Sequence, residues 1–167
     1  MRTRRTHAAG QRRLRGMRKV MRNLKTELNK IEGKTLQGLI EAAIIIRRDM
    51  AHTPPKVPVD VRNLEASWFT VTSGGKVTAG TSPDFKGNDS NEMAADHSKI
   101  VSTATALITG NKTPVVIMGF SASYAIFVHE NVGANFKRPG SGAKFLEAAL
   151  KRNEKNILET VAKSAKI

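Results

Sequence analysis

The chain has 167 residues, enough for one domain with a single core, and it contains no cysteine, which excludes disulfides, thiol catalysis and cysteine zinc sites. Its longest apolar run, residues 42–46, is far shorter than the roughly 20 residues that a membrane span needs, so no membrane partner is expected. The net charge of +14 is uneven, because residues 1–30 hold eleven Lys/Arg and one acid whereas residues 31–143 are nearly neutral. This asymmetry predicts an acidic partner for the N-terminal segment.

The basic segment, residues 1–30, is expected to be an arm followed by a helix. Residues 1–16 contain mutually repelling arginines and almost nothing apolar to bury, which predicts disorder. From Met17 onward, apolar residues recur at spacings of three and four, which predicts a helix that Gly33 interrupts. A second helix is expected over residues 35–51, and the prolines that follow would end it.

The middle of the chain is expected to contain a hairpin. Residues 61–67 fit a short turn or helix, and residues 68–72 (WFTVT) have high strand propensity. The Gly74-Gly75 pair favours a tight turn, so residues 76–79 are predicted to be the returning strand.

The next segment, residues 81–112, is interpreted as a long insertion of loop and strand. Residues 81–98 carry Pro, Gly, Asn and Asp with no clear period, which predicts a loop. The alternating pattern of residues 100–108 favours a strand, and residues 115–120 (VVIMGF) are the most strand-like in the chain.

The C-terminal part is expected to be helical. A short helix is predicted over residues 124–131, capped by Ser121 or Ser123, and a last helix with an apolar stripe over residues 143–163. Because helices and strands are segregated along the chain, the fold class is α+β. Residues 31–167 are therefore predicted to form a single domain, a small antiparallel sheet packed against two long helices.

No set of residues in the sequence predicts an active site, a cofactor or a metal. The four histidines, His7, His52, His97 and His129, lack the converging partners or the His-x-x-x-His spacing typical of metal sites. No phosphate-binding loop, dinucleotide fingerprint or nucleophile elbow is present. The expectation is a protein that is not an enzyme, with a small hydrolase of unrecognised site as the distant alternative.

The basic segment is the strongest isolated feature. It fits contact with phosphates, which would be non-specific and sensitive to salt. It fits equally an acidic protein surface, and less well a membrane surface, since large aromatics are missing. The candidate contact residues are Arg2, Arg4, Arg5, Arg12, Arg13, Arg15, Arg18, Lys19 and Arg22.

Three segments together resemble the small tail-completion or neck proteins of long-tailed phages. The first, within residues 51–68, contains the Val59-Asp60 step followed by Leu64 and Ser67, although Val61-Arg62 replaces the usual Thr-Gly. The second, residues 124–133 (YAIFVHENVG), is similar to the family's Tyr-Ala-x-x-Val-Glu-x-Gly-Thr with His129 added. The third, residues 143–150 (AKFLEAAL), is similar to the start of the family's last helix.

The resemblance implies a virion protein that assembles in the host cytoplasm into a homo-oligomeric ring, of six or twelve copies, at the head–tail junction. Its neighbours would be a head-side connector or portal, or a tail terminator or tube protein, with genomic DNA passing through the ring. The resemblance further implies that Tyr124, Phe127 and Val128 lie in the core beside Phe145 and Leu146. The residues expected near a subunit boundary are Glu130, Asn131, Phe136, Lys137 and Arg138.

Overall fold

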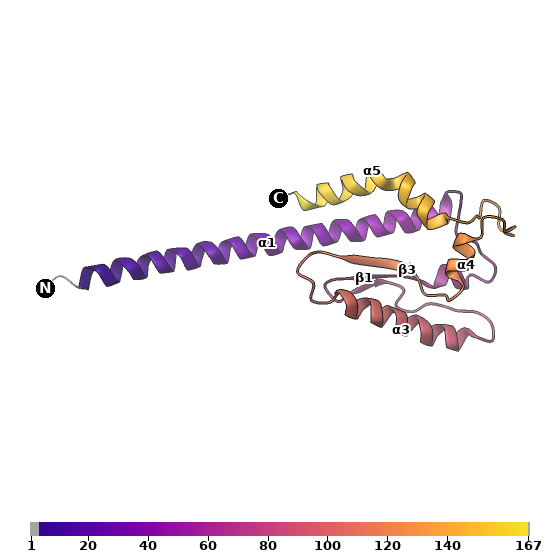
Figure 1. Ribbon diagram of the computed structural model, residues 1–167, viewed down its shortest axis with the longest axis horizontal. Coiled ribbons are helices and arrows are strands. Elements are labelled where there is room, and N and C mark those ends of the chain that lie inside the picture. Colours follow the sequence, from indigo (N-terminus) through magenta and orange to yellow (C-terminus); the bar gives the residue numbers. More distant parts are fainter. Residues whose placement is uncertain (1–3, 167) are drawn as a thin grey trace.

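The protein has the expected α+β architecture, five helices and three strands in the described part of the chain (Figure 1). The computed structural model describes the backbone of residues 4–166 and the side chains of residues 17–166. The elements are α1 (Arg4–His52), α2 (Asn63–Ala66), β1 (Trp68–Thr72), β2 (Val77–Ala79), α3 (Ser90–Ile108), β3 (Val116–Phe120), α4 (Ala125–Glu130) and α5 (Phe145–Ala165).

The sheet has the order β2-β1-β3, and both pairings are antiparallel. Trp68 pairs with Phe120 at one end of β1 and Thr72 pairs with Val116 at the other. All five residues of the central strand β1 are buried, which explains why its sequence is almost continuously apolar or β-branched. The predicted strands over residues 68–72, 76–79 and 115–120 are confirmed to within one residue.

The two faces of β1 belong to two hydrophobic clusters. On one face Trp68 packs with Ile46 and Met50 of α1 and with Phe145 and Ala149 of α5. On the other face a second cluster forms between the sheet and α3, and its buried members are Phe69, Val71, Val101, Ala104 and Ile108. The sheet therefore lies between α3 and the α1/α5 pair, as Figure 1 shows.

Helices α1 and α5 run antiparallel in close contact. A Cβ atom on Gly38 would lie 2.9 Å from both the Cβ of Ser164 and the Cα of Val161, so only glycine allows this approach. Near the end of α5, the Nζ of Lys34 donates to the carbonyl oxygen of Lys166 at 3.1 Å. The part of α1 that precedes Lys34 projects beyond α5 (Figure 1).

Two expectations for the N-terminal segment are wrong. The helix α1 begins at Arg4, so most of the segment expected to be a disordered arm is helical, and Gly33 does not interrupt it. Arginine is a good helix former, and one glycine costs only about 1 kcal/mol relative to alanine in a helix interior. Flanking helical turns on both sides offset that cost.

The expectation for residues 81–108 is also wrong. Residues 90–108 form the single helix α3, where a loop and a strand were predicted. The buried residues His97, Val101, Ala104 and Ile108 recur at helical spacing. Alternating β-branched residues masked this period, and packing against the sheet resolved the ambiguity in favour of the helix.

The C-terminal helices lie where they were predicted, but three details differ. Neither serine caps α4, because its N-cap is Tyr124 and no side chain bonds to the cap position. Tyr124 and Phe127 are not core residues, since they are 38% and 75% exposed. Val128 and Leu146 do pack against the core cluster, and Phe145 is buried within it.

Candidate functional site

Exposed basic side chains lie on the part of α1 that projects past α5. Arg18, Lys19 and Arg22 are exposed, and the salt bridges among residues 17–166 include none of them. They therefore remain available to an acidic partner. The other candidate contact residues lie outside the side chains that the structure describes: Arg2, Arg4, Arg5, Arg12, Arg13 and Arg15.

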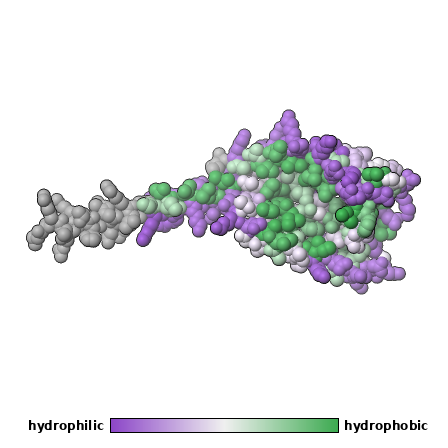
Figure 2. Space-filling view, viewed as in Figure 1, coloured by the Kyte–Doolittle hydropathy of each residue, from purple (hydrophilic) through white to green (hydrophobic). Residues whose placement is uncertain are grey.

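The same projecting part of α1 also carries exposed apolar side chains, visible as green atoms along it in Figure 2. Five apolar residues there are between 49% and 64% exposed: Met17, Val20, Met21, Leu24 and Leu28. The sequence showed this period but predicted nothing about what covers it. Exposed apolar side chains in a continuous stripe are typical of a surface that binds another protein.

Glu130, one of the predicted interface residues, is held in place at the end of α4. Its carboxylate accepts hydrogen bonds from the Nζ of Lys144 and from the Nδ1 of His129, the latter at 2.8 Å. The hydrogen bond from Lys144, and to a smaller extent that from His129, hold the pKa of Glu130 below its ordinary value. This triad fixes the start of α5 to the end of α4.

The loop after α4 carries the other predicted interface residues, and two of them are anchored by their side chains. Lys137 donates to Asp60 at 2.8 Å, a hydrogen bond that raises the pKa of Lys137. Arg138 donates to the carbonyl oxygen of Ala51 at 3.4 Å. Phe136 is half-buried and Asn131 is exposed. The structure thus gathers the five residues around one end of the molecule.

An acidic groove at that end was missed by the sequence reasoning. One hollow of about 270 Å³ is lined by Asp89, Glu92, Asp96 and Tyr124 among others, and an adjoining hollow of about 480 Å³ shares Asp89 and Tyr124 with it. Burial of the phenol, and to a smaller extent the negative charge of Asp60, raise the pKa of Tyr124. A usable signal was present, since residues 84–98 contain four acids and one lysine.

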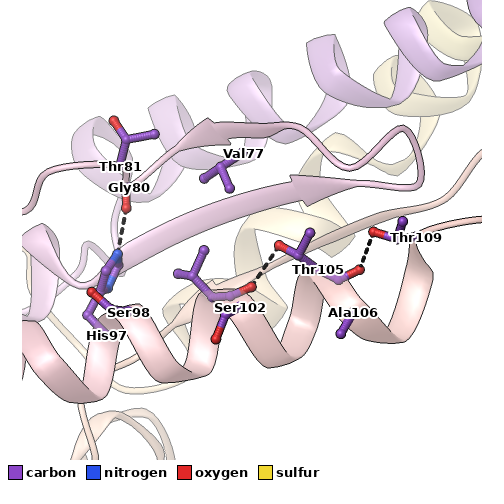
Figure 3. Close-up of a pocket in the computed structure, with 10 residues that line it drawn as sticks. Val77, Gly80, Thr81, His97, Ser98, Ser102, Thr105, Ala106 and Thr109 are labelled. Carbon is purple, nitrogen blue, oxygen red and sulfur yellow. Dashed lines mark hydrogen bonds between the residues drawn. The ribbon is translucent and has the colours of Figure 1, made fainter.

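The buried pair His97 and Ser121 has the form of a base and a hydroxyl nucleophile. The Nδ1 of His97 lies 2.7 Å from the Ser121 Oγ. Its Nε2 lies 2.6 Å from the carbonyl oxygen of Gly80, the contact drawn in Figure 3. A carbonyl oxygen only accepts, so Nε2 carries the proton and Nδ1 accepts from Ser121. Both side chains are at most 5% exposed, and the pair ties α3 to the sheet.

The groove beside His97, between β2 and α3, offers little to a polar ligand. Its volume is about 720 Å³, and hydroxyl groups of α3 line it (Figure 3). Thr105 and Thr109 each donate to a carbonyl oxygen four residues earlier at 2.7 Å, and Ser102 donates to that of Lys99. These donors already have acceptors, so the groove has few groups left to orient a substrate.

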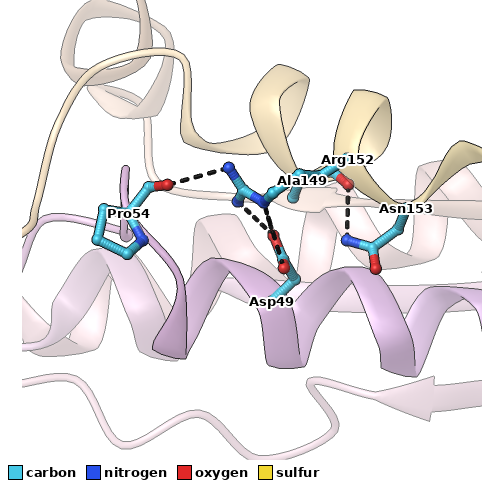
Figure 4. Close-up of polar contacts among 5 residues, drawn as sticks. All are labelled: Asp49, Pro54, Ala149, Arg152 and Asn153. Atoms are coloured by element: carbon cyan, nitrogen blue, oxygen red, sulfur yellow. Dashed lines mark hydrogen bonds and ion pairs between the residues drawn. The ribbon is translucent and has the colours of Figure 1, made fainter.

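A further polar cluster joins α1 to α5. The guanidinium of Arg152 binds the carboxylate of Asp49 through two nitrogens and donates to the carbonyl oxygen of Pro54 at 3.0 Å (Figure 4). Burial alone would raise the pKa of Asp49, but hydrogen bonds led by that of Arg152 outweigh it and hold the pKa below its ordinary value. The side chain of Arg152 is 35% exposed and that of Asp49 is 14% exposed, so the pair is partly shielded from solvent where it joins the two helices.

Within the described residues, no group of three or more His, Asp or Glu side chains is arranged to hold a metal ion. Among the helices searched, none has an apolar stretch long enough to cross a bilayer. Comparisons of the chain with protein-family models, with curated proteins and with solved structures gave no match.

Proposed function

We propose that this protein is a structural subunit of a tailed-phage virion, a neck or tail-completion protein that forms a ring at the head–tail junction around the DNA channel. It acts by binding further copies of itself and the neighbouring ring, on the head side or the tail side, and it catalyses no reaction. The basic projecting helix would contact an acidic neighbour or the genomic DNA.

The observation that supports this proposal best is the convergence of the three family-like segments on one hydrophobic cluster. Val57, Leu64 and Trp68 come from the first segment. Val128 comes from the second segment, and Phe145, Leu146 and Ala149 from the third. Segments that make one packing unit are expected to keep their order and spacing together, whereas chance similarities need not meet in space.

The backbone links the segments as well. Lys56 forms a parallel bridge with Ser141, and the amide of Lys144 donates to the carbonyl oxygen of His129 at 2.7 Å. The first segment is thereby joined to the loop before α5, and the second to the start of α5. A subunit boundary in this region would be rigid, as a ring contact needs to be.

The decisive experiment is made on the parent phage. Disrupting the gene should yield filled heads and separate tails, and supplying the wild-type chain in trans should restore joined particles. Mass spectrometry of purified particles should find six or twelve copies per virion, and a particle map should place them at the neck. Complete infectious particles that lack the chain would exclude the proposed function.

A free nucleic-acid-binding protein is the second candidate, favoured by the exposed cations of α1. It predicts that the chain binds duplex DNA and that the logarithm of the association constant falls linearly with the logarithm of the salt concentration. The slope should be roughly −0.9 for each phosphate contact. The double variant Arg18→Glu plus Arg22→Glu should then weaken binding at least tenfold. The matched control, Lys151→Glu plus Lys155→Glu on exposed positions of α5, changes the net charge equally and should bind as the wild type does.

A further inference from the structure

The apolar stripe on the projecting part of α1 continues the surface that α1 presents to α5. Met17, Met21, Leu24, Leu28 and Ile31 follow one another at alternating spacings of four and three. The same alternation leads on to positions 35, 38 and 42, and positions 38 and 42 are buried. Because position 38 contacts α5 directly, the stripe lies on the α5-facing side of α1.

The stripe therefore has the character of a helix-packing surface without its partner helix. The described part of α5 covers α1 only from about Lys34 onward, where Lys34 reaches the carbonyl oxygen of Lys166. Residues 21–30 are all exposed. The flanking charges are mostly positive, with Arg18, Arg22 and Lys25 against Glu27, so a complementary surface is apolar and acidic.

The acidic groove beside Tyr124 has these two properties. Asp89, Glu92 and Asp96 are exposed, and the salt bridges among residues 17–166 include none of them. The half-buried side chain of Met93 lines both hollows, and the exposed Val61 and the half-buried Val128 line the larger one. Apolar side chains thus lie next to unpaired carboxylates, as a basic amphipathic helix requires.

The stripe and the groove lie at opposite ends of one molecule. Figure 1 shows the projecting part of α1 at one end and α4 at the other. A straight helix does not fold back on its own body, so one copy leaves both surfaces uncovered. Two different surfaces that fit each other generate a head-to-tail contact, which closes into a ring or grows into a filament.

We infer that the projecting part of α1 of one copy docks in the acidic groove of a second copy. This inference rests on the self-association that the proposed function requires, but not on the location in a virion. A polyanion such as DNA would attract Arg18 and Arg22 yet leave Leu24 and Leu28 in water. Two parallel copies of α1 would bring the like charges of the basic segment together.

The test uses two full-length variants that each lack one surface. The stripe variant is Leu24→Asp plus Leu28→Asp, at exposed positions, and the groove variant is Asp89→Lys plus Glu92→Lys, also exposed. Sedimentation velocity over a concentration series should show oligomers larger than dimers for the wild type. Each variant alone should stay monomeric, with association weakened at least tenfold.

Mixing the two variants should restore one contact. The stripe variant keeps its groove and the groove variant keeps its stripe, so the mixture should form a 1:1 dimer and nothing larger. The control variant Glu154→Lys plus Glu159→Lys, at exposed positions of α5, should assemble as the wild type does. Fluorescence of the single tryptophan, Trp68, verifies that each variant is folded.

Three results would overturn the inference. If the wild type assembles but the mixed variants form no dimer, the copies bind each other through surfaces other than the stripe and the groove. That result would leave the proposed ring intact. If the wild type remains monomeric at every concentration, the chain does not bind itself through these surfaces. If the stripe variant loses only binding to added duplex DNA, the helix is a nucleic-acid element. Absence of the chain from the particle would instead refute the virion role alone.

Discussion

Arg152 of α5 forms an ion pair with Asp49 of α1, although the two residues are 103 positions apart in the sequence. The same guanidinium donates to the carbonyl oxygen of Pro54, just beyond the end of α1. One side chain thus joins the last turn of α1 and the chain that leaves it to the first half of α5.

Replacing Arg152 with alanine should lower the free energy of unfolding by about 1 kcal/mol, because a charged hydrogen-bonded pair at a partly buried position is lost. Urea denaturation followed by Trp68 fluorescence measures this. Lys155→Ala removes a longer and more exposed pair with Glu159, at 3.9 Å, and should change stability by less than about 0.5 kcal/mol. Equal effects of both substitutions would contradict the role given to Arg152.

The same contact predicts a pH dependence. The pKa of Asp49 is lowered in the folded protein, so the stabilisation is fully present above the ordinary aspartate pKa of about 4. The stabilisation is lost as the pH falls from about 4 through the lower pKa that Asp49 has in the folded protein, because the folded state binds a proton there less readily than the unfolded state. Asp49→Asn should flatten the fall in stability below about pH 4, and an unchanged slope would refute this.

Two glycines of α1 should respond to alanine in opposite directions. A Cβ at Gly33 meets nothing within 4 Å, so Gly33→Ala should stabilise the helix by about 0.5–1 kcal/mol. A Cβ at Gly38 would lie 2.9 Å from backbone and side-chain atoms of α5, so Gly38→Ala should destabilise by about 1–3 kcal/mol. Thermal unfolding of the two variants in parallel tests the pair. A stable Gly38→Ala variant would mean that α5 packs elsewhere.

His97 should be important for stability because both ring nitrogens have partners. Substitution by alanine leaves a cavity near Phe69 and Phe85 and removes the partners of the Ser121 hydroxyl and the Gly80 carbonyl. A loss of about 2–4 kcal/mol is expected in urea denaturation. His52→Ala, at an exposed position of α1, is the control and should be nearly neutral. A small effect at His97 would show that water replaces the ring.

Hydrogen exchange should divide α1 into two parts. Amides of residues 21–30 lie in a part of α1 whose side chains are all exposed, so they should exchange fast in the monomer. Amides of residues 42–50 should exchange far more slowly, because Ala42, Ala43, Ile46 and Met50 anchor that part of α1 in the core. Mass spectrometry of peptic fragments resolves the two ranges. Uniform slow exchange along α1 in a monomer would contradict the lack of tertiary support.

The sequence by itself determined the α+β class, the strands of the sheet, the two long helices and the uneven charge, because each rests on a local pattern. The run from Trp68 to Thr72 is strand-like on both faces, and the stripe of α5 has a clear helical period. The three family-like segments were also readable as sequence, and their convergence on one cluster required the fold.

Tertiary structure decided what local patterns left open. Residues 100–108 alternate like a strand. In the fold, however, Phe69 and Val71 form an apolar face of the sheet, and a helix that presents Val101, Ala104 and Ile108 covers it. The acidic groove joins Asp89, just before α3, to Tyr124, just before α4, although the two residues are far apart in the sequence. Whether an apolar residue of α1 is core or surface depends on where α5 ends, so Leu24 and Ile46 share one helix and have opposite environments.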